Sequence, residues 1–326
     1  MSQKSTAAME EQSRCFRLVY DIAPQYVNDH CFLREENGNI HLFHIAGLIG
    51  KRCYDAGNEV TFGHATSRDL VEWKREADCL SNDPNSRHEP DHICAPYVCN
   101  AGGKYFLLYG GGNVKSQIEA MCLACSDDLY NWTKHPANPI FRPSRHWAEH
   151  EPFSGLWGCC RDPHVISHPD HGYILYYVAW IKGTRGNLAA LGAAISDNLI
   201  SWQDIGPVMI RERANEYSTA SMESPCVVER EGRFYLFYKH RDETRLAVSE
   251  DPFNFADKQD IWFSVAHAAE IFEIKGRWYI SSCSRELLDV RHEKTDRTKG
   301  LYLACLDWTG DMPCVVPFVP PDSSPT

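Results

Sequence analysis

The chain has 326 residues, of which 43% are hydrophobic, 12% aromatic and 24% charged, a composition typical of a globular protein rather than a disordered or fibrous one. Its formal net charge of -11 and the absence of any basic block argue against a nucleic-acid partner, because a phosphate backbone favours clustered Lys and Arg. No apolar run approaches the roughly 18 residues that a membrane helix needs, so we expect no membrane partner.

The two ends of the sequence differ from its middle. Residues 1–14 are polar and lack the basic start, apolar segment and cleavage site of a secretory signal, so we expect a flexible tail and a cytoplasmic protein. The Pro-rich residues 318–326 predict a second tail, which leaves 15–317 for the folded domain. Many of the 14 cysteines, such as Cys122, Cys226 and Cys305, lie in apolar strand patterns, which favours buried thiols over a disulfide framework.

Five copies of a hairpin pattern follow one another along the chain. Each copy has polar residues, a short strand, a turn containing glycine or small polar residues, and a second strand of aromatic and branched residues. In chain order the copies cover residues 28–44, 95–109, 161–177, 223–238 and 269–281. Such an internal repeat decides the fold before any local assignment does.

A second element follows each hairpin. Ser67, Ser126 and Ser196 are each followed at the same offsets by an Asp or Asn, a Leu and a Trp, and a related run leads from Ser249 to Phe255. We interpret this element as a strand that ends in a tight turn, with the Ser and Asp side chains bonded to the backbone and the aromatic ring packed between neighbours. The fifth copy ends in a degenerate form of it.

The spacing of the copies predicts the architecture. They align at His30, Pro96, Pro163, Pro225 and Ala269, a period of about 65 residues that shortens at the end and suits a four-stranded antiparallel blade. Five such blades fill the chain. The sequence therefore predicts an all-β protein, a five-bladed β-propeller in a single domain.

In a propeller, the innermost strands surround the axis, so the residues that begin the first strand of each copy converge there. Three copies bring a carboxylate to this place: Asp29, Asp162 and Glu223. Crowded carboxylates shift one another's pKa values, so that one can remain protonated as a general acid while another is ionised. Glycoside hydrolysis needs this division of labour, which makes the three residues catalytic candidates. Arg161 is expected to hold Asp162 ionised, as suits a charge stabiliser.

Further polar and aromatic residues lie near the predicted pocket. The residues expected to bind substrate are Asn28, Arg161, His44, Trp157, Trp180, His240 and Arg241. Several of them end the second strand of a copy, and Trp157 offers an apolar face to a sugar ring. His267 and Glu270 are additional candidates for contact with substrate or an ion. Because no residues have the spacing of a dedicated metal site, we expect no metal and no cofactor.

These residues carry a resemblance to a known family. Asn28-Asp29 followed by Ile40-His41-Leu42-Phe43, the run from Gly63 to Trp73, Arg161-Asp162-Pro163, and Glu223 before Ser224-Pro225 resemble the motifs of glycoside hydrolase family 32. That family contains invertases and fructanases, and it shares a five-bladed propeller with family 43, which contains arabinosidases and xylosidases. The resemblance covers roughly residues 20 to 310.

The resemblance implies a role for each carboxylate. By family 32, Asp29 matches the nucleophile, Asp162 the transition-state stabiliser and Glu223 the acid/base of a retaining β-fructofuranosidase. By family 43, the same positions are the general base, an orienting and pKa-modulating acid, and the general acid. The chain departs from family 32 in having His30-Cys31-Phe32 after Asp29, Ser224 after Glu223, and no expected β-sandwich after the propeller.

The leading hypothesis is therefore a glycosidase that cleaves terminal furanosyl residues from a small carbohydrate, a β-fructofuranosidase-like retaining enzyme. The alternatives are an inverting arabinofuranosidase or xylosidase of the family 43 type, and a non-catalytic sugar-binding propeller. The sequence specifies neither the sugar, the linkage nor the oligomeric state.

Overall fold

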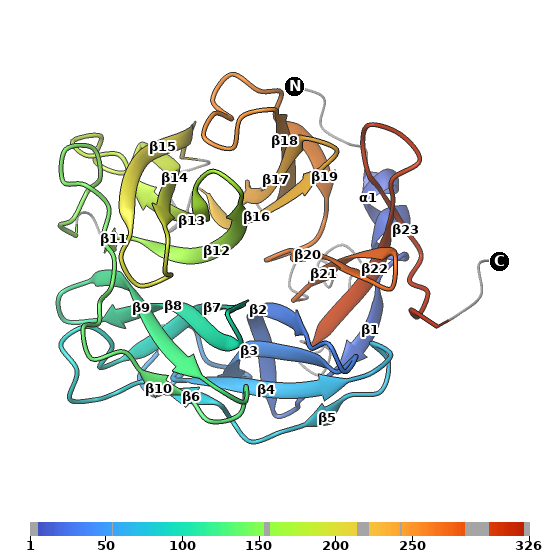
Figure 1. Cartoon of the computed structure of the whole chain (residues 1–326), viewed down its shortest axis with the longest axis horizontal. Coiled ribbons are helices and arrows are strands. Elements are labelled where there is room, and N and C mark those ends of the chain that lie inside the picture. The colour runs from blue at the N-terminus through green and yellow to red at the C-terminus, as the bar shows by residue number, and fades with distance from the viewer. Residues whose placement is uncertain are drawn as a thin grey trace.

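The computed structural model describes residues 6–53, 55–152, 157–213, 222–241, 243–283 and 300–322. Five sheets, built mainly from antiparallel pairs, stand around a common axis, each with the first strand of its repeated hairpin nearest the centre (Figure 1). This arrangement confirms the five-bladed β-propeller in a single domain.

The blades follow one another in chain order. The first blade consists of β2 (Gln25–Arg34), β3 (Ile40–Leu48), β4 (Thr61–Ser67), β5 (Lys74–Arg75) and β6 (Leu80–Ser81). The second consists of β7 (His92–Ala101), β8 (Lys104–Asn113), β9 (Ile118–Ser126), β10 (Thr133–Lys134) and β11 (Gly158–Cys159). The third contains β12 (Arg161–His168), β13 (Gly172–Trp180), β14 (Leu188–Ser196) and β15 (Gln203–Glu212). The fourth contains β16 (Glu223–Arg230), β17 (Arg233–His240), β18 (Glu243–Ser249) and β19 (Ile261–Ser264). The fifth contains β20 (Ile271–Ile274), β21 (Arg277–Ser282), β22 (Leu301–Asp307), β23 (Cys314–Val316) and also β1 (Arg17–Tyr20).

The ring is closed by a strand from the other end of the chain. β1 pairs antiparallel with β22, so that Arg17 lies opposite Leu303 and Leu18 opposite Tyr302. The last blade thus contains both the first and the last strands of the sequence. Because these backbone hydrogen bonds join the two ends of the ring, the fifth blade cannot separate from the first without breaking them.

The N-terminal segment corrects one expectation. Residues of the predicted flexible tail form a helix, α1 (Thr6–Ser13), beside the fifth blade (Figure 1). The side-chain amide of Gln12 donates to the carbonyl of Phe263 at 2.9 Å and accepts the N–H of Val265 at 3.1 Å. Met9 packs against the apolar cluster that contains Phe263 and Val265. The helix depends on these distant partners, which its polar sequence does not reveal. Met1–Ser5 lie outside the described residues.

The predicted C-terminal tail is also packed, as far as the structure describes it. Phe318 and Val319 lie against the apolar cluster of the fifth blade. The carbonyl of Val319 accepts the hydroxyl of Tyr279 at 3.1 Å, and the backbone N–H of Phe318 donates to the carbonyl of Cys15 at 3.0 Å. Residues 323–326 lie outside the described part.

The repeated serine motif forms the predicted turn. Ser67 Oγ accepts the backbone N–H of Leu70 at 3.0 Å and that of Asp69 at 3.2 Å. Leu70 has a φ of 63°, a left-handed conformation that these side-chain bonds support at a residue other than glycine. Equivalent contacts follow Ser126 and Ser196. The same local chemistry therefore ends the third strand of three blades.

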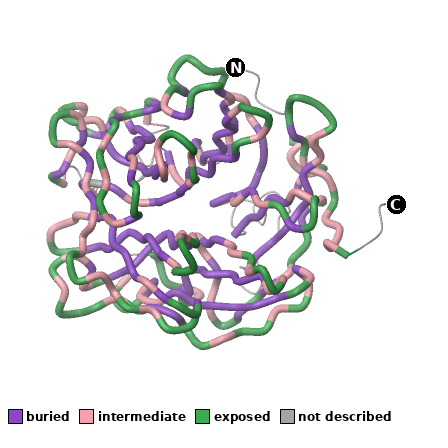
Figure 2. The backbone as a smooth tube through the Cα atoms, in the orientation of Figure 1, coloured by how far each residue is buried: buried purple, intermediate pink, exposed green. Residues whose placement is uncertain are grey.

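The innermost strands share an irregularity that matters for the site. The pairing register of β2, β7, β12 and β16 with the next strand is interrupted at the aligned position of each copy. Three residues at these breaks have a positive φ: Ala95 at 48°, Asp162 at 56° and Ser224 at 50°. Such backbone strain costs about 1–3 kcal/mol per residue and is found where a side chain is aimed for function. The inner strands are largely buried, with exposed loops at the periphery (Figure 2).

The cysteines agree with the expectation from their strand patterns. Cys122, Cys226 and Cys305 are buried free thiols, as their strand patterns predicted. Within the described residues, the structure contains no helix with the length and apolar character needed to cross a bilayer.

Candidate active site

The starts of the inner strands meet in a cavity on the propeller axis. Residues from all five blades line it: Asp29, His30, Ala95, Pro96, Asp162, Pro163, Ser224, Pro225, Ala268 and Glu270. The structure thus brings Asp29 and Asp162 together, as the repeat alignment predicted, and Glu223 is the chain neighbour of the lining residue Ser224. Ala95, Asp162 and Ser224, which have a positive φ at the breaks in register, are among these lining residues.

Glu223 is held between two cations. Lys239 Nζ lies 3.2 Å from Glu223 Oε2, and Arg161 Nη2 lies 3.3 Å from Glu223 Oε1. Burial alone would raise the pKa of this carboxyl group, but the charges of Lys239 and Arg161 outweigh it and lower the pKa to about 2. Glu223 is therefore ionised in the ligand-free chain at any physiological pH. Its side chain retains 26% exposure, so a ligand in the funnel can reach it.

Asp162 contacts the predicted partner but does not behave as expected. Arg161 Nε lies 3.5 Å from Asp162 Oδ1, and the backbone N–H of Ser224 donates to Asp162 Oδ2 at 3.0 Å. Burial of this 5% exposed residue nevertheless dominates, and it raises the pKa to about 6 despite the opposing charge of Arg161. The carboxylate is ionised at neutral pH, yet it takes up a proton in mildly acidic solution, contrary to the expectation that Arg161 would prevent this.

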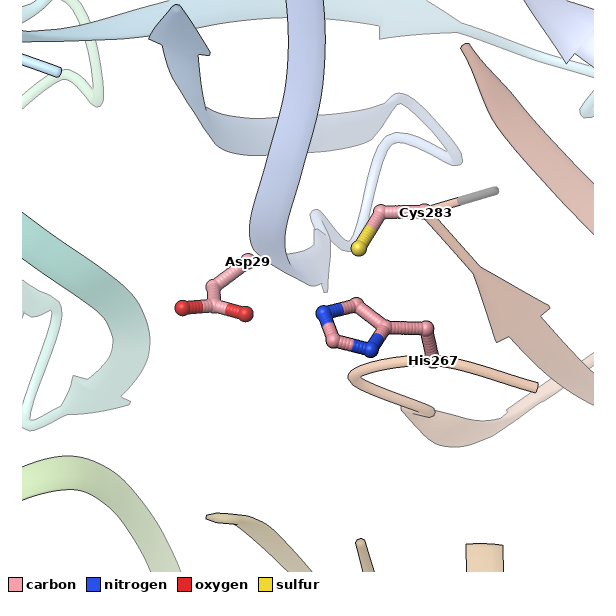
Figure 3. Close-up of side chains that lie close together, drawn as sticks. All are labelled: Asp29, His267 and Cys283. Carbon is pink, nitrogen blue, oxygen red and sulfur yellow. The ribbon is translucent and has the colours of Figure 1, made fainter. Parts of the chain in front are cut away.

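The pKa of Asp29 is shifted in the direction opposite to that of Glu223. Burial raises the pKa of Asp29 well above its usual range, and the negative charges of Asp162 and Glu223 raise it further. Its carboxylate points toward the ring of His267, with Cys283 beside them (Figure 3). The potential ligand atoms of these three residues lie within 4.8 Å of one another. Among the three catalytic candidates, Asp29 is thus the preferred location of a proton in the ligand-free site.

Lys239 and Glu119 belong to the site, although the sequence did not indicate them. Glu119 is buried in β9, where its Oε2 accepts Arg161 Nη1 at 3.2 Å and its Oε1 lies 3.4 Å from His92 Nε2. It fixes the guanidinium that bridges Asp162 and Glu223. The repeat alignment missed Glu119 because it begins a third strand rather than an inner one, and it missed Lys239 by selecting its neighbour His240.

Asn28 is oriented by another buried acid. Its side-chain amide donates to Glu59 Oε1 at 3.0 Å, and the hydroxyl of Tyr26 donates to the same oxygen at 2.7 Å. Cys283 Sγ contacts Asn28 Oδ1 at 3.5 Å. Asn28 therefore stands beside Asp29 in a fixed orientation. Glu59 lies in the connection between β3 and β4, where no strand pattern marks it.

Other predicted binding residues do not line the axial cavity. His44, Trp180 and His240 are all buried within or between blades, because their strands are covered on both sides by neighbours. His44 packs edge-on against Tyr20 with the ring centroids 5.6 Å apart. Arg241 is exposed in the turn after β17. Trp157 contacts the ring of His92 at 4.9 Å, which places it next to Glu119 rather than among the cavity residues.

The arrangement supplies what acid/base hydrolysis requires. Two ionised carboxylates and one protonated one share a small region with Arg161 and Lys239, and their pKa values are driven apart by burial and by the two cations. Among these three carboxyl groups, one therefore carries a transferable proton near neutral pH. In the ligand-free chain this proton is on Asp29, whereas protonation of a leaving group by Glu223 requires it to move.

Comparison with known proteins relates the chain to glycoside hydrolases. The sequence profile described as glycosyl hydrolases family 43 matches residues 53–239, more than half of the chain. A sucrose-6-phosphate hydrolase of Bacillus subtilis is 29% identical over 160 residues, which is 48% of this chain and 30% of that protein. The chain spans less than a third of the length of the curated relatives it matches.

Solved structures show the same fold over nearly the whole chain. A family 43 enzyme from Xanthomonas citri, solved with xylotriose, has a TM-score of 0.65 at 14% identity, covering 97% of both chains. A family 32 β-fructofuranosidase of Bombyx mori also has a TM-score of 0.65, at 18% identity, covering 96% of this chain and 68% of that one. The propeller is thus common to both families, and the profile match to family 43 stands beside distant curated relatives that act on sucrose-6-phosphate and fructans, such as a fructan 1-exohydrolase of Triticum aestivum, 26% identical over 191 residues. The chain belongs to glycosyl hydrolases family 43.

Proposed function

We propose that the protein is a glycosidase that removes a terminal sugar from a short oligosaccharide. The observation that carries this proposal is that Asp29 and Asp162 line one axial cavity, with Glu223 next to its lining residue Ser224, and that the pKa values of Asp29 and Glu223 are shifted in opposite directions. In the family 43 scheme, Asp29 acts as general base, Glu223 as general acid and Asp162 orients the acid. The substrate is a small carbohydrate.

The chemical steps assigned to these residues are those of an inverting hydrolysis. Ionised Asp29 takes a proton from a water molecule as that water attacks the anomeric carbon. Protonated Glu223 donates its proton to the glycosidic oxygen as the bond to the leaving group breaks. Sugar hydroxyls that replace Glu223 as partners of Lys239 and Arg161 would raise the pKa of Glu223. The proton held by Asp29 can then be shared with Glu223 while the site keeps its total charge.

A second candidate is the retaining β-fructofuranosidase expected from the sequence motifs. Here Asp29 attacks the anomeric carbon as nucleophile, Glu223 is acid and then base, and Asp162 stabilises the transition state. The identity to the Bacillus subtilis sucrose-6-phosphate hydrolase favours this candidate. The inverting scheme is preferred because the profile of family 43 covers two of the three carboxylates, Asp162 and Glu223.

One experiment separates the two candidates. The purified chain is incubated with arabinofuranosides, xylosides, sucrose and short inulin and levan oligomers, and the first anomer released is followed by proton NMR. Inversion on an arabinoside or xyloside supports the proposal, whereas retention on a fructoside supports the second candidate. If no substrate is hydrolysed while Asp29→Asn and Glu223→Gln bind sugars as the unaltered chain does, the protein is a non-catalytic sugar-binding propeller.

The cytoplasmic location expected from the sequence is a further part of the proposal. It rests on the polar character of residues 1–14. Fractionation of the source cells, with the activity recovered outside the cytosolic fraction, would contradict it.

A further inference from the structure

A second cluster of reactive side chains lies on the axis and is not used by the proposed reaction. His164 comes from β12, Cys226 from β16, and Glu270 immediately precedes β20. These strands belong to three successive blades and follow one another around the centre of the ring (Figure 1). An imidazole nitrogen, a thiol sulfur and a carboxylate oxygen of the three residues lie within 4.8 Å of one another.

The imidazole of His164 is oriented as a ligand. Its Nε2 lies 3.1 Å from the carbonyl oxygen of Val227, which can only accept a hydrogen bond, so Nε2 carries the proton. The other nitrogen, Nδ1, then presents a lone pair 3.8 Å from Glu270 Oε2. This buried Nδ1 has no hydrogen-bond partner among the described residues, and the side chain is only 4% exposed. The gap between Nδ1 and the Glu270 carboxyl group is too long for a hydrogen bond, so the lone pair of Nδ1 remains available to another partner.

Cys226 and Glu270 complete the cluster. Cys226 is fully buried, and its sulfur accepts the backbone N–H of Ile271 at 3.3 Å, which fixes the position of the sulfur. Glu270 is one of the residues that line the axial cavity, so an ion can reach the cluster through the funnel. The cavity side is also where water can supply another ligand.

We propose that His164 Nδ1, Cys226 Sγ and the carboxylate of Glu270 bind a divalent transition metal of the zinc type. Nitrogen, sulfur and carboxylate oxygen are the donors that Zn²⁺ prefers in proteins, with bonds of about 2.0–2.3 Å. Atoms bound to one such ion lie roughly 3.3–3.8 Å apart, which the separation of Nδ1 from Oε2 matches. Ca²⁺ and Mg²⁺ take oxygen ligands and do not suit the thiolate and imidazole.

Two other groups in the described part of the chain bring three potential ligand atoms equally close. One of them contains Asp29, which the proposed reaction needs as a proton acceptor. The other consists of His92, Cys94 and Glu119, but there Glu119 already forms an ion pair with Arg161. In the axial cluster, His164 faces Glu270 with a lone pair, and neither residue forms such an ion pair with Arg or Lys among the described contacts.

The proposed metal would connect three blades near the axis. Because its ligands come from separate blades and meet only in the folded ring, metal binding favours the folded chain over the unfolded one. Because the three residues are far apart in the chain, no metal-site spacing is visible in the sequence. The inference does not rest on the proposed glycosidase activity, since metal binding is measured without a substrate.

The experiment uses the full chain, dialysed against a chelator and then titrated with Co²⁺. We expect one equivalent of Co²⁺ to bind, with the thiolate-to-cobalt charge-transfer absorption that reports a cysteine ligand. Zn²⁺ should displace the cobalt and abolish this absorption, because zinc binds such donors more tightly, whereas excess Ca²⁺ should not. If the unaltered chain binds no stoichiometric Co²⁺, or binds it without the charge-transfer band, the proposal is wrong.

Single substitutions test which side chains bind the metal. Cys226→Ser should lose the charge-transfer band, and His164→Gln should weaken or abolish binding while its amide can still donate to the carbonyl of Val227. Cys122→Ser, which alters an equally buried thiol in the second blade, is the matched control and should retain the band. Loss of the band in Cys283→Ser but not in Cys226→Ser would place the metal beside Asp29 and overturn the assignment.

Discussion

Replacement of Lys239 by Met tests the electrostatic description of the site. Lys239 Nζ lies 3.2 Å from Glu223 Oε2, a distance at which unit charges interact by about 1.3 kcal/mol in water and about 5 kcal/mol at an effective dielectric constant of 20. Glu223 is 26% exposed and keeps Arg161, so the lower part of this range applies. At about 1.4 kcal/mol per pKa unit, we expect the pKa of Glu223 to rise by about one unit or more from about 2.

The assay is the pH dependence of kcat/KM, which reports the ionisations of the free enzyme. On the acidic side, protonation of Asp162, with a pKa of about 6, comes first, and the ionisation of Glu223, with its lower pKa, adds a second limb at lower pH, while the basic limb belongs to Asp29. We therefore expect Lys239→Met to move this second acidic limb to higher pH by about one unit and to leave the basic limb nearly in place. Movement of the basic limb alone would mean that Glu223 has the higher pKa and would refute the reasoning.

Stability provides a second measurement for the same variant. The folded-state pKa of Glu223 lies below its usual value of 4.5, so the ion pair stabilises the folded chain above that pH and this contribution is lost as the pH falls toward about 2. The difference in unfolding free energy between the two proteins should therefore shrink on acidification. Lys104→Met is the matched control, because Lys104 is 52% exposed and pairs only loosely with Asp127 at 3.8 Å.

The remaining predictions concern the carboxylates and the N-terminal helix. Glu223→Gln should lower kcat by about 10²–10⁴-fold for a sugar with a poor leaving group, and much less for an activated aryl glycoside that needs no protonation; equal losses on both would contradict a general-acid role. Asp29→Asn should abolish hydrolysis yet raise the unfolding free energy at neutral pH by about 0.5–2 kcal/mol. The reason is that the raised pKa of Asp29 obliges the carboxyl group to take up a proton on folding, a cost that the neutral amide does not have, and denaturant unfolding that shows a loss of stability would count against this. Glu119→Gln should lower kcat/KM and cost about 1–3 kcal/mol of stability, because it weakens the hydrogen bond that holds the guanidinium of Arg161. Both effects are measured on one preparation, and an unchanged kcat/KM would show that the guanidinium does not need this hydrogen bond. Gln12→Ala should cost about 1–3 kcal/mol in a thermal or denaturant melt, because two backbone groups of the fourth blade lose their partner, and unchanged stability would show that α1 is dispensable.

Much of the fold follows from local patterns in the sequence. The repeated hairpins, their period and the serine-led turns each depend on residues close in the chain, and so they can be identified without tertiary information. Convergence of Asp29, Asp162 and Glu223 also followed, because a propeller places equivalent positions of its repeats around one axis. The repeat pattern did not predict ring closure by β1 or the packing of α1 and Phe318, since each depends on partners from a distant part of the chain.

The sequence by itself determined that this chain forms a five-bladed ring and which carboxylates lie at its centre. Only the tertiary structure decided their protonation, because a pKa depends on burial and on charges such as Lys239 and Glu119 that come from other strands. It also decided that His44 and Trp180 pack inside the blades, and that His164, Cys226 and Glu270 meet. Contacts of this kind join residues whose separation in the chain carries no periodic signal, so they exist as a pattern only after the ring has formed.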